Sequence, residues 1–220
     1  MFQDLIFINS TLKMPLMALP VRTTIVTLAH QNILISPGSQ LNLEDYNSMP
    51  NITAIIAPNL FHCAGVEKAA KHFPNASKWG PPGVKEKFSA LHWDQYLNNS
   101  KWLFDPDLNL IPILGMPKIN EMIFYHKSSK SLIVTDFCFN LIDANGFGAW
   151  LILSLFGTYQ KFGISRFFLK YVEDPIAFKS SIQNLFDFDF DHIILSHGQN
   201  IIGNAKAHLQ KALKERNFEF

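Results

Sequence analysis

Three residues whose side chains can bind a metal ion or carry a proton stand just after apolar stretches of the sequence. His62 follows the run ITAIIA, Asp136 ends the run LIVTD, and His197 ends the run IILSH. Short apolar runs of this kind are typical of buried strands, and α/β proteins bind ligands at the carboxyl ends of their strands. Two imidazoles and one carboxylate gathered there would suit one zinc or iron ion that keeps a position open for water.

Each of these residues also has an interpretation that involves no chemistry. A histidine at the end of a strand is commonly a hydrogen-bonded structural residue, and Asp136 could cap the turn that follows it. Spacing along the chain does not by itself prove that the three side chains meet. The remaining histidines, at positions 30, 72, 92, 126, 192 and 208, are expected at the surface, in turns or on helix faces.

Two groups of strands, each followed by helices, are expected to position these residues. The first group comprises a hairpin of residues 21–27 and 31–35, a strand at 52–57, a helix at 64–73 and a loop-and-helix excursion at 84–109. The second comprises strands at 110–114, 121–126 and 131–136, a helical stretch at 148–186 broken at 174–175, a strand at 191–196 and a helix at 203–216. This order predicts an α/β protein with two sheets between layers of helices, an αββα sandwich.

The composition is that of a folded protein and argues against several function classes. Of 220 residues, 48% are hydrophobic and 17% charged, which predicts a single domain over residues 1–220. The formal net charge of +1 gives no reason to expect nucleic acid as a partner. Two distant cysteines, Cys63 and Cys138, indicate reduced thiols and a cytoplasmic location. The first residues do not have the pattern of a signal peptide.

The run FGAWLILSLFG at residues 147–157 is the longest apolar stretch of the chain. A transmembrane helix needs about 20 apolar residues, so no transmembrane segment is expected. As a helix this run would be apolar almost all round, which predicts burial, first of all inside the chain. The alternatives are a homodimer contact through residues 147–171, a lid over an apolar substrate, or a role at a membrane surface.

Four segments, at residues 19–39, 55–83, 121–141 and 188–201, carry a resemblance to a known family. With their PN-x-x-H, LIVTD and SHG motifs in this order, they resemble the metallo-β-lactamase superfamily, and within it the DUF4336 family. The resemblance implies the metallo-β-lactamase fold for the chain. It also implies that His62, Asp136 and His197 match the ligands of the superfamily's second metal position.

The resemblance is incomplete where the superfamily binds its first metal ion. The H-x-H-x-D-H loop of the superfamily reads A-P-N-L-F-H here, so Asn59 replaces a histidine and Phe61 replaces the aspartate that orients the attacking water. The later G-H-T-P-G loop reads G-M-P-K-I and has no histidine. These departures imply a degenerate site that holds at most one metal ion.

Two further residues are candidate catalytic groups. Asn59 could bond a substrate carbonyl, or it could close its own Pro-Asn turn. Glu121 begins an expected strand near the same rim and could act as a ligand or base in place of the missing aspartate. The alternative for Glu121 is an exposed residue at the edge of the strand.

Two functions remain open from the sequence. The first is a metal-dependent hydrolase acting on an ester, thioester or lactone-like small molecule, motivated by His62, Asp136 and His197. The second is a non-catalytic binding or interaction module that keeps the fold, motivated by the missing ligands and the missing aspartate.

Overall fold

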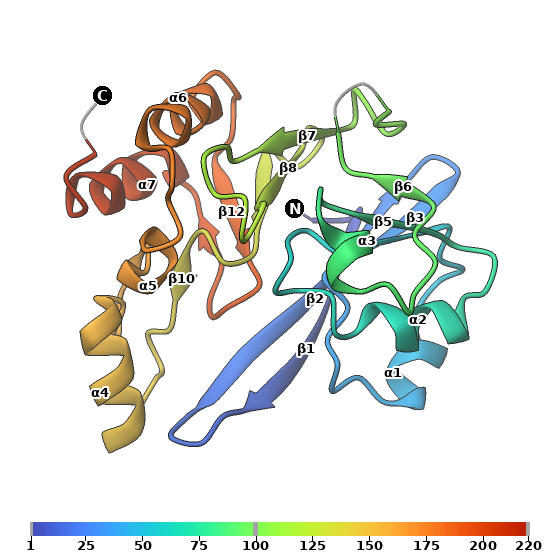
Figure 1. Ribbon diagram of the computed structural model, residues 1–220, viewed down its shortest axis with the longest axis horizontal. Coiled ribbons are helices and arrows are strands. Elements are labelled where there is room, and N and C mark those ends of the chain that lie inside the picture. The colour runs from blue at the N-terminus through green and yellow to red at the C-terminus, as the bar shows by residue number, and fades with distance from the viewer. Residues whose placement is uncertain (1, 99–100, 219–220) are drawn as a thin grey trace.

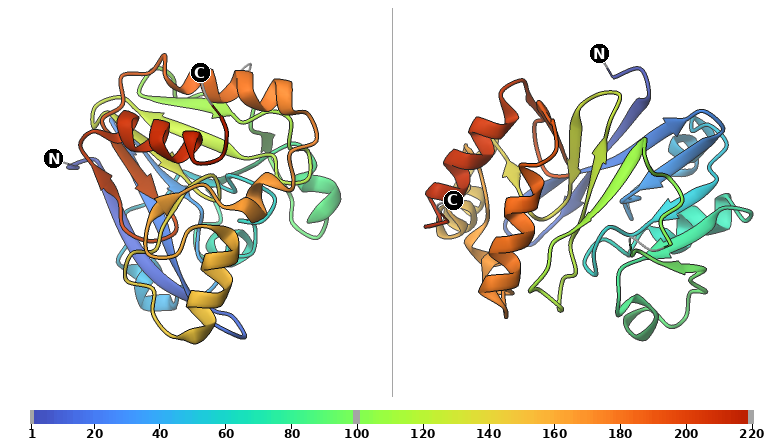
Figure 2. Two further views of the ribbon diagram at one scale, coloured as in Figure 1. Left: turned by 90° about the vertical axis from the view of Figure 1, so that its left-hand side faces the viewer. Right: turned by 90° about the horizontal axis from the view of Figure 1, so that it is seen from above.

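A computed structural model describes residues 2–98 and 101–218. Two β-sheets pack face to face, and helices cover the outer face of each sheet (Figure 1). Seen from above, helices α6 and α7 form the outer layer on one side, and the shorter helices of the N-terminal half lie on the other (Figure 2). This is the αββα sandwich expected from the sequence.

The first sheet contains six strands in sequential order, antiparallel at its start and parallel from β3 onward. They are β1 (Leu5–Lys13), β2 (Ala18–Leu28), β3 (Gln31–Ile35), β4 (Ala54–Ile56), β5 (Ser77–Gly80) and β6 (Gln95–Tyr96). The helices of this half are α1 (Leu43–Asn47), α2 (Val66–His72) and α3 (Val84–Lys87). The long β1–β2 hairpin projects beyond the rest of the sheet (Figure 1).

The second sheet has the order β13-β12-β9-β8-β7. Its strands are β7 (Leu108–Pro112), β8 (Met122–His126), β9 (Ser131–Val134), β12 (His192–Leu195) and β13 (Ile201–Ile202). The remaining elements are the ribbon of β10 (Phe139–Asn140) and β11 (Phe162–Gly163) and the helices α4 (Phe147–Phe156), α5 (Arg166–Leu169), α6 (Pro175–Leu185) and α7 (Ala205–Lys214). Helix α6 begins where expected, because the Asp174 side chain accepts hydrogen bonds from two backbone amides of its first turn.

Apolar residues of both sheets meet in the middle of the sandwich. This cluster joins residues of β3 and β4 to residues of β8, β9 and β12, among them Ile33, Ile56, Phe124, Ile133 and Ile194. Two further clusters lie under the outer helices, one on each side. The short apolar runs that precede His62, Asp136 and His197 therefore form strands buried on both faces, as expected for a sheet covered by helices.

Several expectations about individual residues are wrong. His126 and His192, expected at the surface, are 1% and 7% exposed. Each ring has an internal partner: His126 Nδ1 lies 2.7 Å from Ser129 Oγ, and His192 Nδ1 accepts a hydrogen bond of 2.9 Å from the amide of Gly203.

Strands β1 and β5 were not anticipated from the sequence.

Helix α4 is formed as expected, but its burial inside the chain is only partial. Ala149 and Leu153 are buried, whereas Phe147, Trp150 and Leu155 are 74%, 48% and 65% exposed. Helix α4 therefore has apolar side chains on all sides, and the rest of the chain covers only part of this surface. Within the described residues, no helix is both long and apolar enough to cross a membrane.

Candidate metal centre

The strand register brings the two C-terminal candidate ligands together. Strands β9 and β12 are parallel neighbours in which Val134 pairs with Leu195. Asp136 and His197 each lie two residues beyond this pair, so both leave the sheet at the same edge. His62 reaches the same place from the other sheet, in the loop that follows β4.

The three side chains converge on a small space. The Nε2 atoms of His62 and His197 are 3.2 Å apart, and each lies 3.3 Å from a carboxylate oxygen of Asp136. Ligand atoms bound to one tetrahedral ion at 2.0–2.1 Å lie roughly 3.3 Å from one another. The two imidazole nitrogens therefore have the spacing of two ligands of one four-coordinate ion. Asp136 turns Oδ2 toward His62 and Oδ1 toward His197, and one ligand atom from each of the three residues lies within 4.8 Å of the other two. The group can thus supply three ligands to a single ion and leave one position open. Among the residues that the structure describes, this is the one group of three such ligands that converges in this way.

The other ring nitrogens are held by groups that favour metal binding. His197 Nδ1 lies 2.8 Å from the carbonyl oxygen of Pro20, which can only accept, so this nitrogen carries the proton. A metal ion bound at Nε2 would then replace only the proton that this nitrogen shares with Asp136, 3.3 Å away. His62 Nδ1 lies 2.7 Å from Ser36 Oγ, which can accept in the same way. Ser36 itself has a φ of 55°, a left-handed conformation that is uncommon for serine.

Asn59 and Glu121 form a buried support beneath the three ligands, and both are 0% exposed. The side-chain oxygen of Asn59 accepts hydrogen bonds of 2.8 Å from the backbone amides of Phe61 and His62. The amide nitrogen of Asn59 donates to Glu121 Oε2 at 2.5 Å and to Asp136 Oδ2 at 2.8 Å. Asn59 thus closes its own turn, one of the two roles considered for it, and also ties the His62 loop to Asp136.

The carboxylate of Glu121 is the acceptor for the start of the loop that carries Asp136. Its Oε1 accepts from the Thr135 hydroxyl at 2.7 Å and from the backbone amides of Thr135 and Asp136 at 3.1 Å each. The expectation of an exposed strand-edge residue is therefore wrong. The sequence places Glu121 correctly near the site, but its atoms face inward rather than into the open cleft.

Burial and charge shift the pKa values of the two carboxyl groups in opposite directions. Burial raises the pKa of Glu121 to about 7, with a further contribution from the negative charge of Asp136. Burial also acts to raise the pKa of Asp136, but the charge of His62 and the hydrogen bonds of both histidines outweigh it and hold that pKa well below its usual range. Asp136 is therefore available in the ionised form that a metal ligand requires.

Arg22 holds the loop that carries His197. Its Nη1 donates to the carbonyl oxygens of Leu195 at 2.6 Å and Gly198 at 3.0 Å, and to Asn200 Oδ1 at 2.6 Å. Gly198, directly after His197, has a φ of 99°, and a Cβ atom there would lie 2.1 Å from the carbonyl oxygen of Asn140. The glycine of the SHG motif is thus required by backbone conformation and by close packing.

An apolar cleft of about 280 Å³ opens above the three ligands. His62, Asp136 and His197 line it, together with Phe61. The other lining residues come from the β1–β2 hairpin and from the loops at 37–40 and 64–65; they are Leu12, Met14, Leu19, Val21, Pro37, Gly38, Ser39, Gln40, Ala64 and Gly65. Asn59 and Glu121 do not line the cleft.

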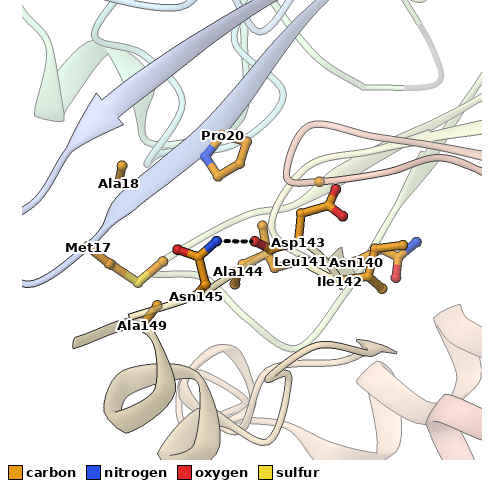
Figure 3. A pocket seen from close by; sticks show the side chains of 11 residues that line it. Met17, Ala18, Pro20, Asn140, Leu141, Ile142, Asp143, Ala144, Asn145 and Ala149 are labelled. Atoms are coloured by element: carbon orange, nitrogen blue, oxygen red, sulfur yellow. Dashed lines mark hydrogen bonds between the residues drawn. The ribbon is translucent and has the colours of Figure 1, made fainter. Parts of the chain in front are cut away.

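A second hollow, of about 210 Å³, lies against other residues of the same hairpin. In Figure 3, Met17, Ala18 and Pro20 face the loop at 140–145 and Ala149 of α4. Pro20 connects the two sites, because its carbonyl oxygen holds His197. None of the three candidate ligands lines this second hollow.

The structure brings together the three residues singled out as metal ligands, and their role in binding a metal stays a prediction. The supporting groups Pro20, Ser36 and Arg22 were not anticipated. Each acts through a contact with a residue distant in the chain, for which the sequence has no local signal.

Comparison with solved structures identifies the fold. No family model and no curated protein matches the chain. A metallo-β-lactamase from Pontibacter korlensis is 12% identical and has a TM-score of 0.66, with 97% of this chain and 96% of that chain covered. A diflavin flavoprotein fragment from Nostoc sp. PCC 7120 is 11% identical, with a TM-score of 0.68 and coverage of 98% and 94%. The flavodiiron core of Flv1 from Synechocystis sp. PCC6803 is 10% identical, with a TM-score of 0.66 and coverage of 98% of this chain and 58% of that one.

At this level of identity, such similarity shows the fold alone. The protein therefore has the metallo-β-lactamase fold, with a group of three candidate metal ligands at one edge of its sandwich.

Proposed function

We propose that this protein is a mononuclear metal-dependent hydrolase of small ester, thioester or lactone-like molecules. His62, Asp136 and His197 would hold one zinc or iron ion. The observation that carries the proposal is the convergence of these side chains in the lining of a cleft: the two Nε2 atoms are 3.2 Å apart, and each lies 3.3 Å from one of the two carboxylate oxygens of Asp136. The proposal also includes a relationship to the DUF4336 family, which the sequence resembles.

The bound ion and the residues around it would have different roles in this hydrolysis. A bound divalent ion would supply Lewis acidity for an acyl carbonyl and for water. Pro20 and Ser36 fix the rings of the two histidines, so that Nε2 of each faces the ion. Asn59 and Glu121 were considered for direct contact with substrate or water. Both side chains are buried outside the cleft, so their proposed role is to position His62 and Asp136.

Turnover is expected to be slow. Phe61 occupies the place where the resemblance implies a water-orienting aspartate, and a general base contributes typically 10²–10⁴-fold. Among the described residues that line the cleft, Asp136 is the one with a carboxylate. Hydrolysis would therefore depend on the metal ion and on binding of the acyl group.

Metal content and ester turnover together test this proposal. Protein purified without added metal is expected to contain about one equivalent of zinc or iron, or to take it up on reconstitution. Chelation should abolish slow hydrolysis of an ester and thioester panel, and re-addition of metal should restore it. Content below about a tenth of an equivalent after reconstitution would refute a metal site. Stoichiometric metal without turnover would favour the alternative, a non-catalytic binding module.

A homodimer through residues 147–171 is a further part of the proposal. It is supported by the exposed side chains of Phe147, Trp150 and Leu155 and by the absence of charged residues from 144 to 160. Leu155→Asp is expected to convert a concentration-dependent dimer into a monomer, as measured by sedimentation equilibrium. Ile176→Asp on α6, where the side chain is 84% exposed, is the matched control. A monomeric unmodified protein at all concentrations would contradict the dimer.

The cytoplasmic location and the single domain over residues 1–220 also stay proposals. The first is supported by Cys63 and Cys138, which are both buried and free. The second is supported by structural neighbours that align over 97% or more of the chain.

A further inference from the structure

We infer that the metal cleft accepts acyl groups that carry an aromatic ring, held against the side chain of Phe61. This inference rests on the proposed hydrolase function and adds the substrate class. Phe61 precedes the candidate ligand His62, lines the cleft and is 40% exposed. A ring bound against Phe61 therefore lies beside the place where an acyl carbonyl would meet the metal ion.

Contacts within the protein hold the ring of Phe61 in its orientation. Tyr171 packs edge-to-face on it, with ring centroids 5.4 Å apart and an interplanar angle of 76°. Lys87 Nζ lies 5.0 Å from the centroid of the same ring and is itself held by a hydrogen bond of 3.0 Å to the carbonyl oxygen of Leu60. Because its orientation is already set, the ring loses little conformational entropy when a ligand packs against it.

The aromatic surface continues outward from the cleft. Tyr171 makes a second edge-to-face contact with Phe167, at 5.3 Å, and Phe167 is 41% exposed. The hairpin contributes Leu12 and Leu19 to the lining of the cleft, and these are direct cross-strand neighbours. The described lining thus combines the aromatic ring of Phe61 with aliphatic side chains.

This arrangement favours an aromatic over a saturated ring. Both would gain from burial of apolar surface, but only the aromatic ring gains in addition from edge-to-face or offset stacking on Phe61. The cleft, at about 280 Å³, is near the lower end of small-molecule pockets, about 300–1,000 Å³. It is therefore matched to a small acyl group with a single ring.

The test compares two acyl groups of nearly equal size on one leaving group. Phenylacetyl and cyclohexylacetyl thioesters of N-acetylcysteamine have the same number of carbon atoms and differ in the ring, which is planar and aromatic in the first and puckered and saturated in the second. With the metal-loaded protein, kcat/KM is expected to be about 2- to 12-fold higher for the phenylacetyl thioester. Phe61→Leu should bring this ratio to about one, whereas Phe147→Leu, at a 74% exposed phenylalanine of α4, should leave it unchanged.

Binding of the free acids separates this inference from the proposed function. Affinities of phenylacetate and cyclohexylacetate for the zinc-loaded protein, measured by calorimetry, should show the same preference and the same loss in Phe61→Leu. A preference in binding without turnover of any thioester would uphold the aromatic site and refute the hydrolase. Turnover with a ratio near one, or with a ratio that is unchanged in Phe61→Leu, would overturn the aromatic site and leave the hydrolase standing.

Discussion

Replacing Asp136 with asparagine, or His197 with alanine, is expected to lower the affinity for zinc by more than about 100-fold. Residues that only support a ligand typically contribute 10–100-fold to metal affinity, and these two side chains are two of the three candidate ligands themselves. Asp136→Asn is the sharper variant, because it keeps the shape of the side chain and removes the charge. Competition with a chromophoric chelator measures the change, and hydrolysis should fall with metal occupancy.

The control for this prediction is His30→Ala, which removes an exposed histidine in the turn between β2 and β3. It should leave zinc affinity and thermal stability unchanged. Circular dichroism establishes that each variant is folded before metal binding is compared. An Asp136→Asn protein that is folded and binds zinc as tightly as the unmodified protein would show that the metal, if bound, lies elsewhere.

The convergence of the three candidate ligands could be anticipated because it follows from strand order. The residues that follow two parallel neighbouring strands lie at the same end of the sheet. This is why Asp136 and His197 meet. The contact with His62 crosses between the two sheets and depends on their packing. The order of motifs in the resemblance, rather than periodicity, was the reason to expect it.

The supporting groups could not be anticipated, for a physical reason. The hydrogen bond that His197 Nδ1 donates to the carbonyl oxygen of Pro20 joins residues 177 positions apart, and a backbone carbonyl is present in every residue. Asn59 has both a donor and an acceptor, so its role depends on which neighbours surround it. Exposure was the alternative considered for Glu121, because buried carboxylates are uncommon, and its five hydrogen bonds exist only in the folded chain.

For helix α4 and strand β1, the expectations from the sequence pattern were incomplete in two different ways. The composition of α4 correctly indicated a helix with apolar residues on every side, but burial is a property of the surroundings, and here Phe147 and Leu155 remain exposed. Strand β1 is half-polar, with the sequence LIFINSTLK and a mostly alternating pattern of exposure along much of its length. That alternation is a strand signal that could have been recognised.

The second large effect is expected for Glu121→Gln, which should destabilise the protein by about 1–3 kcal/mol although it changes only one atom of the side chain. The reason is the direction of the hydrogen bonds. The oxygen of Asn59 is committed to the amides of Phe61 and His62, so its NH₂ group must point at Glu121 and Asp136. Both carboxylate oxygens of Glu121 therefore face donors.

Glutamine cannot satisfy this arrangement in either orientation. If its NH₂ group faces Asn59, two donors meet where the oxygen of Glu121 accepted at 2.5 Å. If it faces the other way, the same conflict arises with the backbone amides of Thr135 and Asp136, which can only donate. The melting temperature should fall by about 2–4 °C for each kcal/mol lost, whereas Glu67→Gln, at an exposed glutamate of α2 paired with Lys71, should change it little. Zinc affinity should also fall by about 10–100-fold, because the support of His62 and Asp136 is disturbed. A Glu121→Gln protein that melts and binds zinc like the unmodified chain would show that this buried carboxylate does not hold the centre in place.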